Sequence, residues 1–108
     1  MKGARAAAVI AAVALVSVGH AQDRFAADEI ERGHQQFERT CAQCHGRNMV
    51  NSGTTVYDLR RFPVDQPDRF FSSLSQGKGN MPAFKDALTL EQMKLLWAYV
   101  GSRGGKEP

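Results

Sequence analysis

The chain has few cysteines, few histidines and no long apolar run. Its 108 residues include only two cysteines, Cys41 and Cys44, and three histidines, whereas zinc sites commonly use two separate pairs of ligands. The Ala/Val-rich apolar stretch at residues 6–18 has thirteen residues, fewer than the roughly 20 that a membrane-spanning helix needs. No segment alternates polar and apolar residues convincingly, as a half-buried strand would. These absences point away from zinc-finger, membrane-spanning and sheet proteins.

The first residues have the pattern of a secretory signal. Lys2 and Arg5 precede the apolar stretch, and a small-x-small sequence at residues 19–21 follows it, as before a cleavage site. We expect residues 1–21 to be a signal peptide and residues 22–108 to form one small mature domain in the periplasm. Retention of the leader as an uncleaved anchor is the alternative.

Removal of this leader changes the charge balance. The full chain has 14 Lys and Arg against 11 Asp and Glu, a formal net charge of +3. Two of the basic residues, Lys2 and Arg5, belong to the leader, so the mature chain has a net charge of about +1. Such a small excess gives no electrostatic reason to expect binding to nucleic acid or to a membrane surface.

Three helical segments are predicted, which makes the fold class all-α. The first covers residues 28–44 and places Ile30, Gly33, Phe37 and Cys41 on one face. A glycine inside a helix is unfavourable by about 1 kcal/mol relative to alanine. Gly33 therefore indicates either simple tolerance or a close crossing by another helix.

The other two helices have clear end signals. Pro67 suits the first position of the second helix, and Gly77 suits the position just after its end. Thr89 and Gln92 have the capping-box spacing at the start of a third helix, whose apolar stripe is Leu90, Met93, Leu96, Trp97 and Val100. Between the first two helices, residues 46–64 form a long irregular segment, which in a small domain indicates a function or a missed element.

The two cysteines are separated by two residues and followed at once by a histidine, in the sequence CAQCH at residues 41–45. This spacing fits a redox dithiol, half of a zinc site or the attachment of c-type haem. Thiols at i and i+3 lie on one side of a helical turn and can form thioethers with the two vinyl groups of one porphyrin. No strands flank the pair and no second pair of ligands exists, so Cys41, Cys44 and His45 are predicted to hold a haem.

Three methionines beyond the leader are candidates for the second axial ligand. Met49 lies only four residues after His45 and is too close in sequence to reach the other face of the ring. Met93 belongs to the apolar stripe, where core packing is expected. Met81 lies in GKGNMPAF, where glycines permit close backbone approach and the proline stiffens the exit, so Met81 is the predicted ligand. His34 is expected to be a surface histidine.

The sequences CAQCHG, GKGNMPAF and LTLEQMKLLWAYV together resemble those of class I c-type cytochromes, over essentially the whole mature chain. The resemblance implies short helices wrapped around one covalent haem c, with Gly33 and Phe37 packed across the C-terminal helix. Family members often have a proline after the motif whose carbonyl binds the proximal imidazole. This chain has no proline at residues 46–61, and a carbonyl near residues 52–54 is expected to replace it.

A narrower resemblance covers the segment NMVNSGTTVYDLRRFP together with the Met81 loop. It is similar to the small cytochromes and cytochrome domains that accompany pyrroloquinoline-quinone-dependent alcohol dehydrogenases. This resemblance implies that Tyr57, Arg60 and Arg61 lie near the haem, with one arginine paired to a propionate. A solvated pair of arginines is the alternative.

Two filled axial positions would leave the iron no open site for a substrate. The expected function is therefore electron transfer rather than enzymatic catalysis. We expect a monomer that takes electrons from a periplasmic dehydrogenase, with a quinoprotein alcohol dehydrogenase as the candidate donor, and passes them toward a terminal oxidase in transient complexes. A haem enzyme or gas sensor with a displaceable Met81, and a dithiol or metal protein without haem, are the alternatives.

Overall fold

The computed structural model describes residues 3–12, 23–51 and 55–108. Residues 3–12 form neither helix nor strand. Among the described residues, no helix combines the length and apolar character needed to cross a membrane. The predicted cleavage site after Ala21 lies outside the described residues, so the signal peptide stays a prediction.

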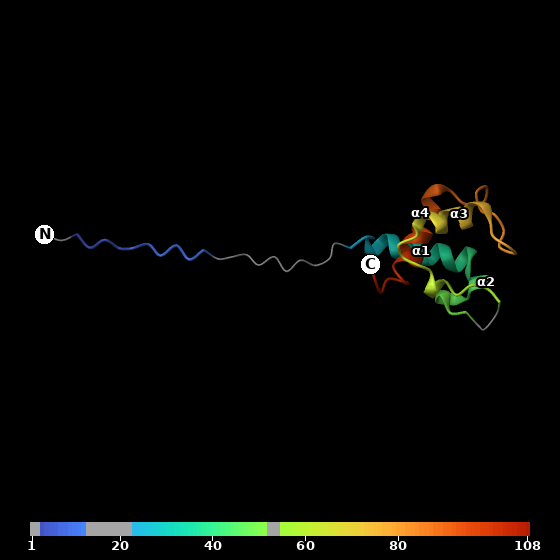
Figure 1. Cartoon of the computed structure of the whole chain (residues 1–108), viewed down its shortest axis with the longest axis horizontal. Coiled ribbons are helices and arrows are strands. Elements are labelled where there is room, and N and C mark those ends of the chain that lie inside the picture. The colour runs from blue at the N-terminus through green and yellow to red at the C-terminus, as the bar shows by residue number, and fades with distance from the viewer. Residues whose placement is uncertain (1–2, 13–22, 52–54) are drawn as a thin grey trace.

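All the regular elements of the described residues are helices (Figure 1), and the predicted all-α fold is confirmed. Its elements are α1 (Ala27–Thr40), α2 (Ala42–His45), η1 (Arg47–Met49), η2 (Leu59–Arg61), α3 (Pro67–Gln76) and α4 (Leu90–Gly101). The two η elements are short 3-10 helices, which sequence patterns did not predict within the segment at residues 46–64. A single isolated β-bridge, between Lys78 and Met81, is found among the described residues.

The predicted first helix is divided at Cys41, and this corrects the expectation of one continuous helix over residues 28–44. Cys41 has φ −114° and ψ −28°, which departs from regular helical geometry. The amide of Cys41 still donates to the carbonyl of Phe37 (2.8 Å), and the amide of His45 donates to the carbonyl of Cys41 (2.9 Å). The break therefore changes the direction of the chain at the motif while the hydrogen bonds continue from α1 into α2.

The other helix ends follow the predicted signals. The Thr89 hydroxyl accepts from the Gln92 amide (3.1 Å), and the Gln92 side chain accepts from the Thr89 amide (2.9 Å), so the capping box is confirmed. Pro67 begins α3, and Gly77 ends it with φ +78°, a left-handed conformation that glycine adopts readily.

Helices α1 and α4 lie side by side (Figure 1) and make the most extensive contact between elements. They cross closely at Gly33. A Cβ atom placed on Gly33 would lie 1.9 Å from the carbonyl oxygen of Leu95 and 3.1 Å from Cβ of Tyr99. The first distance is far below van der Waals contact, so a side chain does not fit here. The close crossing, rather than simple tolerance, explains Gly33.

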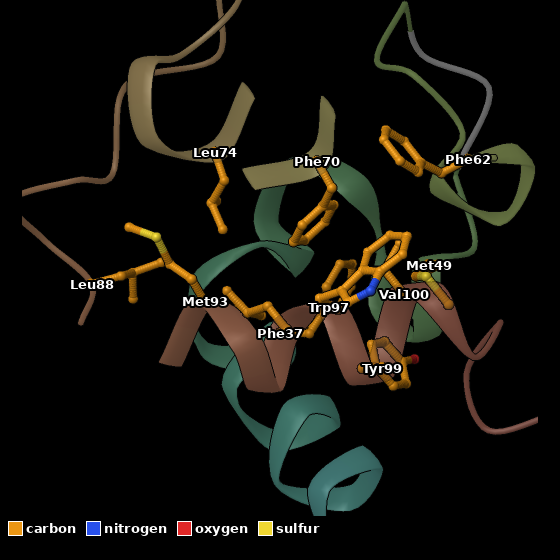
Figure 2. Packing of buried hydrophobic residues seen from close by; sticks show 11 residues of the cluster. Phe37, Met49, Phe62, Phe70, Leu74, Leu88, Met93, Trp97, Tyr99 and Val100 are labelled. Carbon is orange, nitrogen blue, oxygen red and sulfur yellow. The ribbon is translucent and has the colours of Figure 1, made fainter. Parts of the chain in front are cut away.

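Aromatic side chains from α3, from α4 and from Phe62, the residue after η2, form much of the core (Figure 2). The Trp97 ring centroid lies 5.0 Å from that of Phe70 and 5.9 Å from that of Phe62. Aromatic pairs at such distances contribute about 0.5–1.5 kcal/mol each beyond area burial. Phe37 is completely buried, and Met93 is 5% exposed, which confirms its predicted place in the core.

Arg24 links the start of the domain to its end. Its guanidinium donates to the carbonyls of Gly101 (2.8 Å), Glu107 (3.2 Å) and Val64 (3.5 Å), and it lies over the Phe25 ring at 5.1 Å from the centroid. Figure 1 accordingly shows the C-terminus beside the first turn of α1. These bonds join the segment before α1 to the end of α4, to the C-terminal segment and to the segment before α3.

Candidate functional site

An apolar cleft lies between α1, α2, α3 and α4, and we call it the ligand cleft. Its empty space, including the part open to solvent, is about 440 Å³. Among the described residues that line it, only Ser73 has a hydroxyl group. Most of the wall is supplied by Phe37, Phe62, Phe70, Leu74, Leu96 and Val100. Such a lining suits a large apolar group and offers water few hydrogen-bonding partners.

His45 and Met81 both line the ligand cleft, although 36 positions separate them in the sequence. Cys41 also lines it, and Cys44, one helical turn later, is exposed. The structure thus brings three of the four predicted attachment and ligand residues to one cleft, with the fourth on the adjoining turn.

The imidazole of His45 is oriented by a backbone carbonyl. Its Nδ1 lies 3.2 Å from the carbonyl oxygen of Tyr57, and donation from Nδ1 leaves Nε2 with a free lone pair for a metal. Burial lowers the pKa of His45 below its ordinary value, and the bond to Tyr57 partly opposes this effect. The expected carbonyl near residues 52–54 lies outside the described residues, and among the described ones Tyr57 has this role.

The surroundings of Cys41 do not suit a redox dithiol. Burial, with a smaller effect from the neighbouring Cys44, raises the pKa of the Cys41 thiol to about 12. Reactive dithiols have the opposite property, a lowered pKa that yields the thiolate near neutral pH. The thiol chemistry thus favours attachment over redox exchange.

The loop that carries Met81 is held in place by its own backbone. The amide of Lys78 donates to the carbonyl of Met81 (3.1 Å), and the amide of Met81 donates to the carbonyl of Lys78 (3.0 Å). Beyond the loop, the amide of Phe84 donates to the carbonyl of Leu74 in α3 (2.9 Å). A Cβ placed on Gly77 would lie 2.6 Å from the Met81 carbonyl oxygen, so the loop packs tightly against the end of α3.

These features fit an attached haem: an apolar cleft, thiols at i and i+3, and an imidazole and a thioether that line the same cleft. Comparison with known families agrees, because residues 28–100 match the family described as "Cytochrome C oxidase, cbb3-type, subunit III". The chain belongs to the class I c-type cytochromes. Its cofactor is one covalently bound haem c with iron.

Individual relatives of this cytochrome include proteins named cytochrome c6. Cytochrome c6 of Nostoc sp. PCC 7120 is 32% identical over 96 residues, covering 85% of this chain and 86% of the relative. The crystal structure of cytochrome c6C from Synechococcus sp. PCC 7002 has a TM-score of 0.53 and 29% identity, and the match covers 69% of this chain and 96% of that one. These likenesses support haem-based electron transfer and the class I fold.

One relative has a different context. Quinohemoprotein alcohol dehydrogenase ADH-IIG of Pseudomonas putida is 36% identical over 76 residues, which cover 68% of this cytochrome. The same match covers only 10% of the dehydrogenase. The cytochrome therefore resembles one short part of that larger enzyme.

The three residues of the narrower resemblance do not line the ligand cleft of the cytochrome. Tyr57 contributes its carbonyl to His45, while its side chain is 48% exposed and its hydroxyl lies 3.4 Å from the carbonyl of Arg61. Arg60 donates two bonds of 2.9 Å to the Asp58 carboxylate and thereby holds the pKa of that carboxyl below its usual value. A role for Arg60 or Arg61 at a haem propionate stays a prediction.

His34 lies partly exposed at the surface, with 34% of its side chain accessible, and it also has specific partners there. Its ring stacks on Tyr99 with centroids 4.6 Å apart and planes 8° apart. Its Nε2 lies 2.7 Å from Oδ1 of Asn48. The available sequence signal was the spacing of four between His34 and Glu38, which places both on one face of α1.

Proposed function

We propose that this cytochrome is a monomeric periplasmic electron carrier in which Cys41 and Cys44 attach the haem and His45 and Met81 are the axial ligands. The observation that carries the proposal is that His45 and Met81 line one apolar cleft. Haem c in this setting supplies a one-electron Fe(III)/Fe(II) couple.

Each of these residues contributes a distinct property. His45 offers Nε2 while its Nδ1 is held by Tyr57, which fixes the direction of the lone pair. Met81 offers a neutral thioether, and thioether ligation favours the ferrous state. The apolar wall keeps water out and, among the described lining residues, contains no ionisable side chain other than Cys41 and His45. The site thus suits electron transfer better than acid–base catalysis.

The electron donor and acceptor are inferred from the relatives. Similarity to part of a quinohemoprotein alcohol dehydrogenase supports a periplasmic quinoprotein dehydrogenase as the donor. The match to a family described as a subunit of a cbb3-type oxidase supports a terminal oxidase as the acceptor. Stopped-flow reduction of the oxidised cytochrome by a purified quinoprotein alcohol dehydrogenase tests the first inference. We expect the rate of reduction to saturate as the dehydrogenase concentration rises. A rate no faster than in a control that contains alcohol but no dehydrogenase would reject this donor.

The proposed periplasmic location is inferred from the predicted signal peptide at residues 1–21. The leader would direct export, and cleavage after Ala21 would then leave a mature domain of residues 22–108. Mass spectrometry of the cytochrome from a periplasmic extract should give a chain that begins at Gln22. A full-length chain recovered with the membranes would instead indicate an anchor.

The ligand assignment is tested by comparing two methionine variants. Met81→Ala should convert the ferric iron from low spin to high spin, as measured by electron paramagnetic resonance, because it removes an axial ligand. Met93→Ala is the matched control: it should lower the free energy of unfolding by about 2–5 kcal/mol, as expected for a buried methionine, and leave the iron low-spin. A low-spin Met81→Ala protein with a high-spin Met93→Ala protein would reverse the assignment.

A further inference from the structure

The turn after the haem-binding motif has an uncommon backbone. Asn48 and Met49 are consecutive non-glycine residues with φ of 55° and 62°, and Gly46 has φ of 87°. The left-handed region is unfavourable by roughly 1–2 kcal/mol for an ordinary L-residue, and asparagine tolerates it best. A conformation of this kind persists where the surroundings hold it in place.

Two residues of α1, Glu38 and His34, hold the turn, and we call them the α1 clamp. Oε1 of Glu38 accepts from the backbone amide of Asn48 (2.8 Å). Nε2 of His34 lies 2.7 Å from Oδ1 of the same asparagine and 3.3 Å from Oε1 of Glu38. Asn48 is thereby bound through its main chain and its side chain. The stack of His34 on Tyr99 fixes the clamp to α4 as well.

The position of Glu38 is unfavourable for the helix itself. It lies in the last turn of α1, where the helix dipole disfavours an acid by about 0.3–1 kcal/mol. A charge-assisted bond to a backbone amide is roughly twice as strong as a neutral one. The bond to Asn48 therefore offsets the unfavourable position, and the clamp gives Glu38 a role outside α1.

Hydrogen bonds of described residues connect the clamped turn with the carbonyl that orients His45. Further along the same segment, the Asn51 side chain donates to the carbonyl of Val56, and the next carbonyl, that of Tyr57, faces Nδ1 of His45. This chain has no proline in the segment to stiffen it. The position of the Tyr57 carbonyl thus depends on how the segment is anchored.

We infer that Glu38 is a positioning residue for the proximal ligand: by holding Asn48 it fixes the turn from which Asn51 binds the Val56 carbonyl, next to the Tyr57 carbonyl that faces His45. The inference rests on the proposed ligation by His45. Loss of the clamp should weaken the bond from Nδ1, make the imidazole a poorer electron donor to iron and raise the reduction potential.

The test is proton NMR of the haem-loaded protein, with three variants. In the wild type, ligation by His45 should give a hyperfine-shifted Nδ1–H resonance that exchanges slowly with solvent. Glu38→Ala should accelerate that exchange about tenfold or more and raise the midpoint potential. Glu38→Gln keeps an acceptor for Asn48 and should restore most of the protection. Glu31→Ala, an acid of the same helix 3.9 Å from His34, is the matched control and should change the exchange rate less than twofold.

The outcomes separate this inference from the proposed function. Absence of any shifted Nδ1–H signal in the wild type would reject ligation by His45 itself. Unchanged Nδ1–H exchange and potential in Glu38→Ala, with faster exchange of the Asn48 amide, would show that Glu38 holds the turn without positioning the imidazole. Equal effects in Glu38→Ala and Glu31→Ala would show only a general effect of negative charge on α1, and the inference would fail.

Discussion

Gly33 of α1 lies so close to Leu95 of α4 that a Cβ on the glycine would come within 1.9 Å of the leucine carbonyl oxygen. This contact is between backbones, so no rotamer change can relieve it. It fixes the angle at which α1 reaches the break at Cys41, and therefore the place where the haem-binding motif begins. The helix crossing and the ligand cleft are parts of one arrangement.

Gly33→Ala should separate α1 from α4 and lower the free energy of unfolding by at least about 1–3 kcal/mol, the range for overpacking. Urea unfolding followed by circular dichroism measures the change. Gln35→Ala, at an exposed position of the same helix, should change stability by no more than about 0.5 kcal/mol. Equal stabilities of the two variants would mean that α1 and α4 leave room for a side chain at Gly33.

Gly77 and Gly79 form a matched pair for the Met81 loop. Both have positive φ, of 78° and 57°, but a Cβ on Gly77 would lie 2.6 Å from the Met81 carbonyl oxygen, while a Cβ on Gly79 would have nothing within 4 Å. Gly77→Ala should displace the loop and produce a measurable high-spin fraction in the ferric spectrum. Gly79→Ala should lower stability by about 1 kcal/mol through backbone strain alone and keep the wild-type spectrum. The same high-spin fraction in both would contradict this packing.

Tyr99 should influence how the free energy of unfolding changes at alkaline pH. Burial, with smaller effects from the charges of Glu38 and Glu31, raises the pKa of Tyr99 to about 12, above the ordinary value of about 10. Because the folded-state pKa is raised, the stabilisation is complete below about pH 10 and is lost as pH rises toward 12. Free energies of unfolding measured across this range should fall less steeply in Tyr99→Phe than in wild type. Parallel curves would show that another group governs the alkaline loss.

Removing one of these charges gives a second check. Glu31→Gln should move the titration of Tyr99 to lower pH, followed by ultraviolet absorption of the phenolate. The shift should be partial, because burial is the largest cause of the raised pKa. A titration unchanged by Glu31→Gln would exclude a contribution from that carboxylate.

Local signals predicted the parts of the fold that local physics decides. Thr89 and Gln92 satisfy each other at the start of α4, and Pro67 preorganises the first turn of α3, so both helices could be located from sequence. The break at Cys41 could not, because no proline or glycine marks it; it depends on where α1 meets α4. Gly33 was ambiguous for the same reason, since a glycine inside a helix gives no indication of its neighbour.

The candidate site likewise contains residues that the sequence could predict and residues that it could not. The gathering of Cys41, His45 and Met81 at one cleft, with Cys44 on the adjoining turn, was predictable, because haem attachment and ligation would need particular atoms at particular spacings. The clamp by Glu38 and the carbonyl of Tyr57 were not, because any residue has a carbonyl and a carboxylate on a helix usually faces solvent. Each contact joins residues that are ten or more positions apart in the sequence, and the local pattern does not reveal such pairs.

The central claim is that His45 and Met81 together close the iron to outside ligands, and carbon monoxide tests it most directly. The visible spectrum of the dithionite-reduced wild-type protein should not change under carbon monoxide, whereas Met81→Ala should bind the gas stoichiometrically. A wild-type protein that binds carbon monoxide as readily as Met81→Ala would contradict the account and favour a haem enzyme or gas sensor.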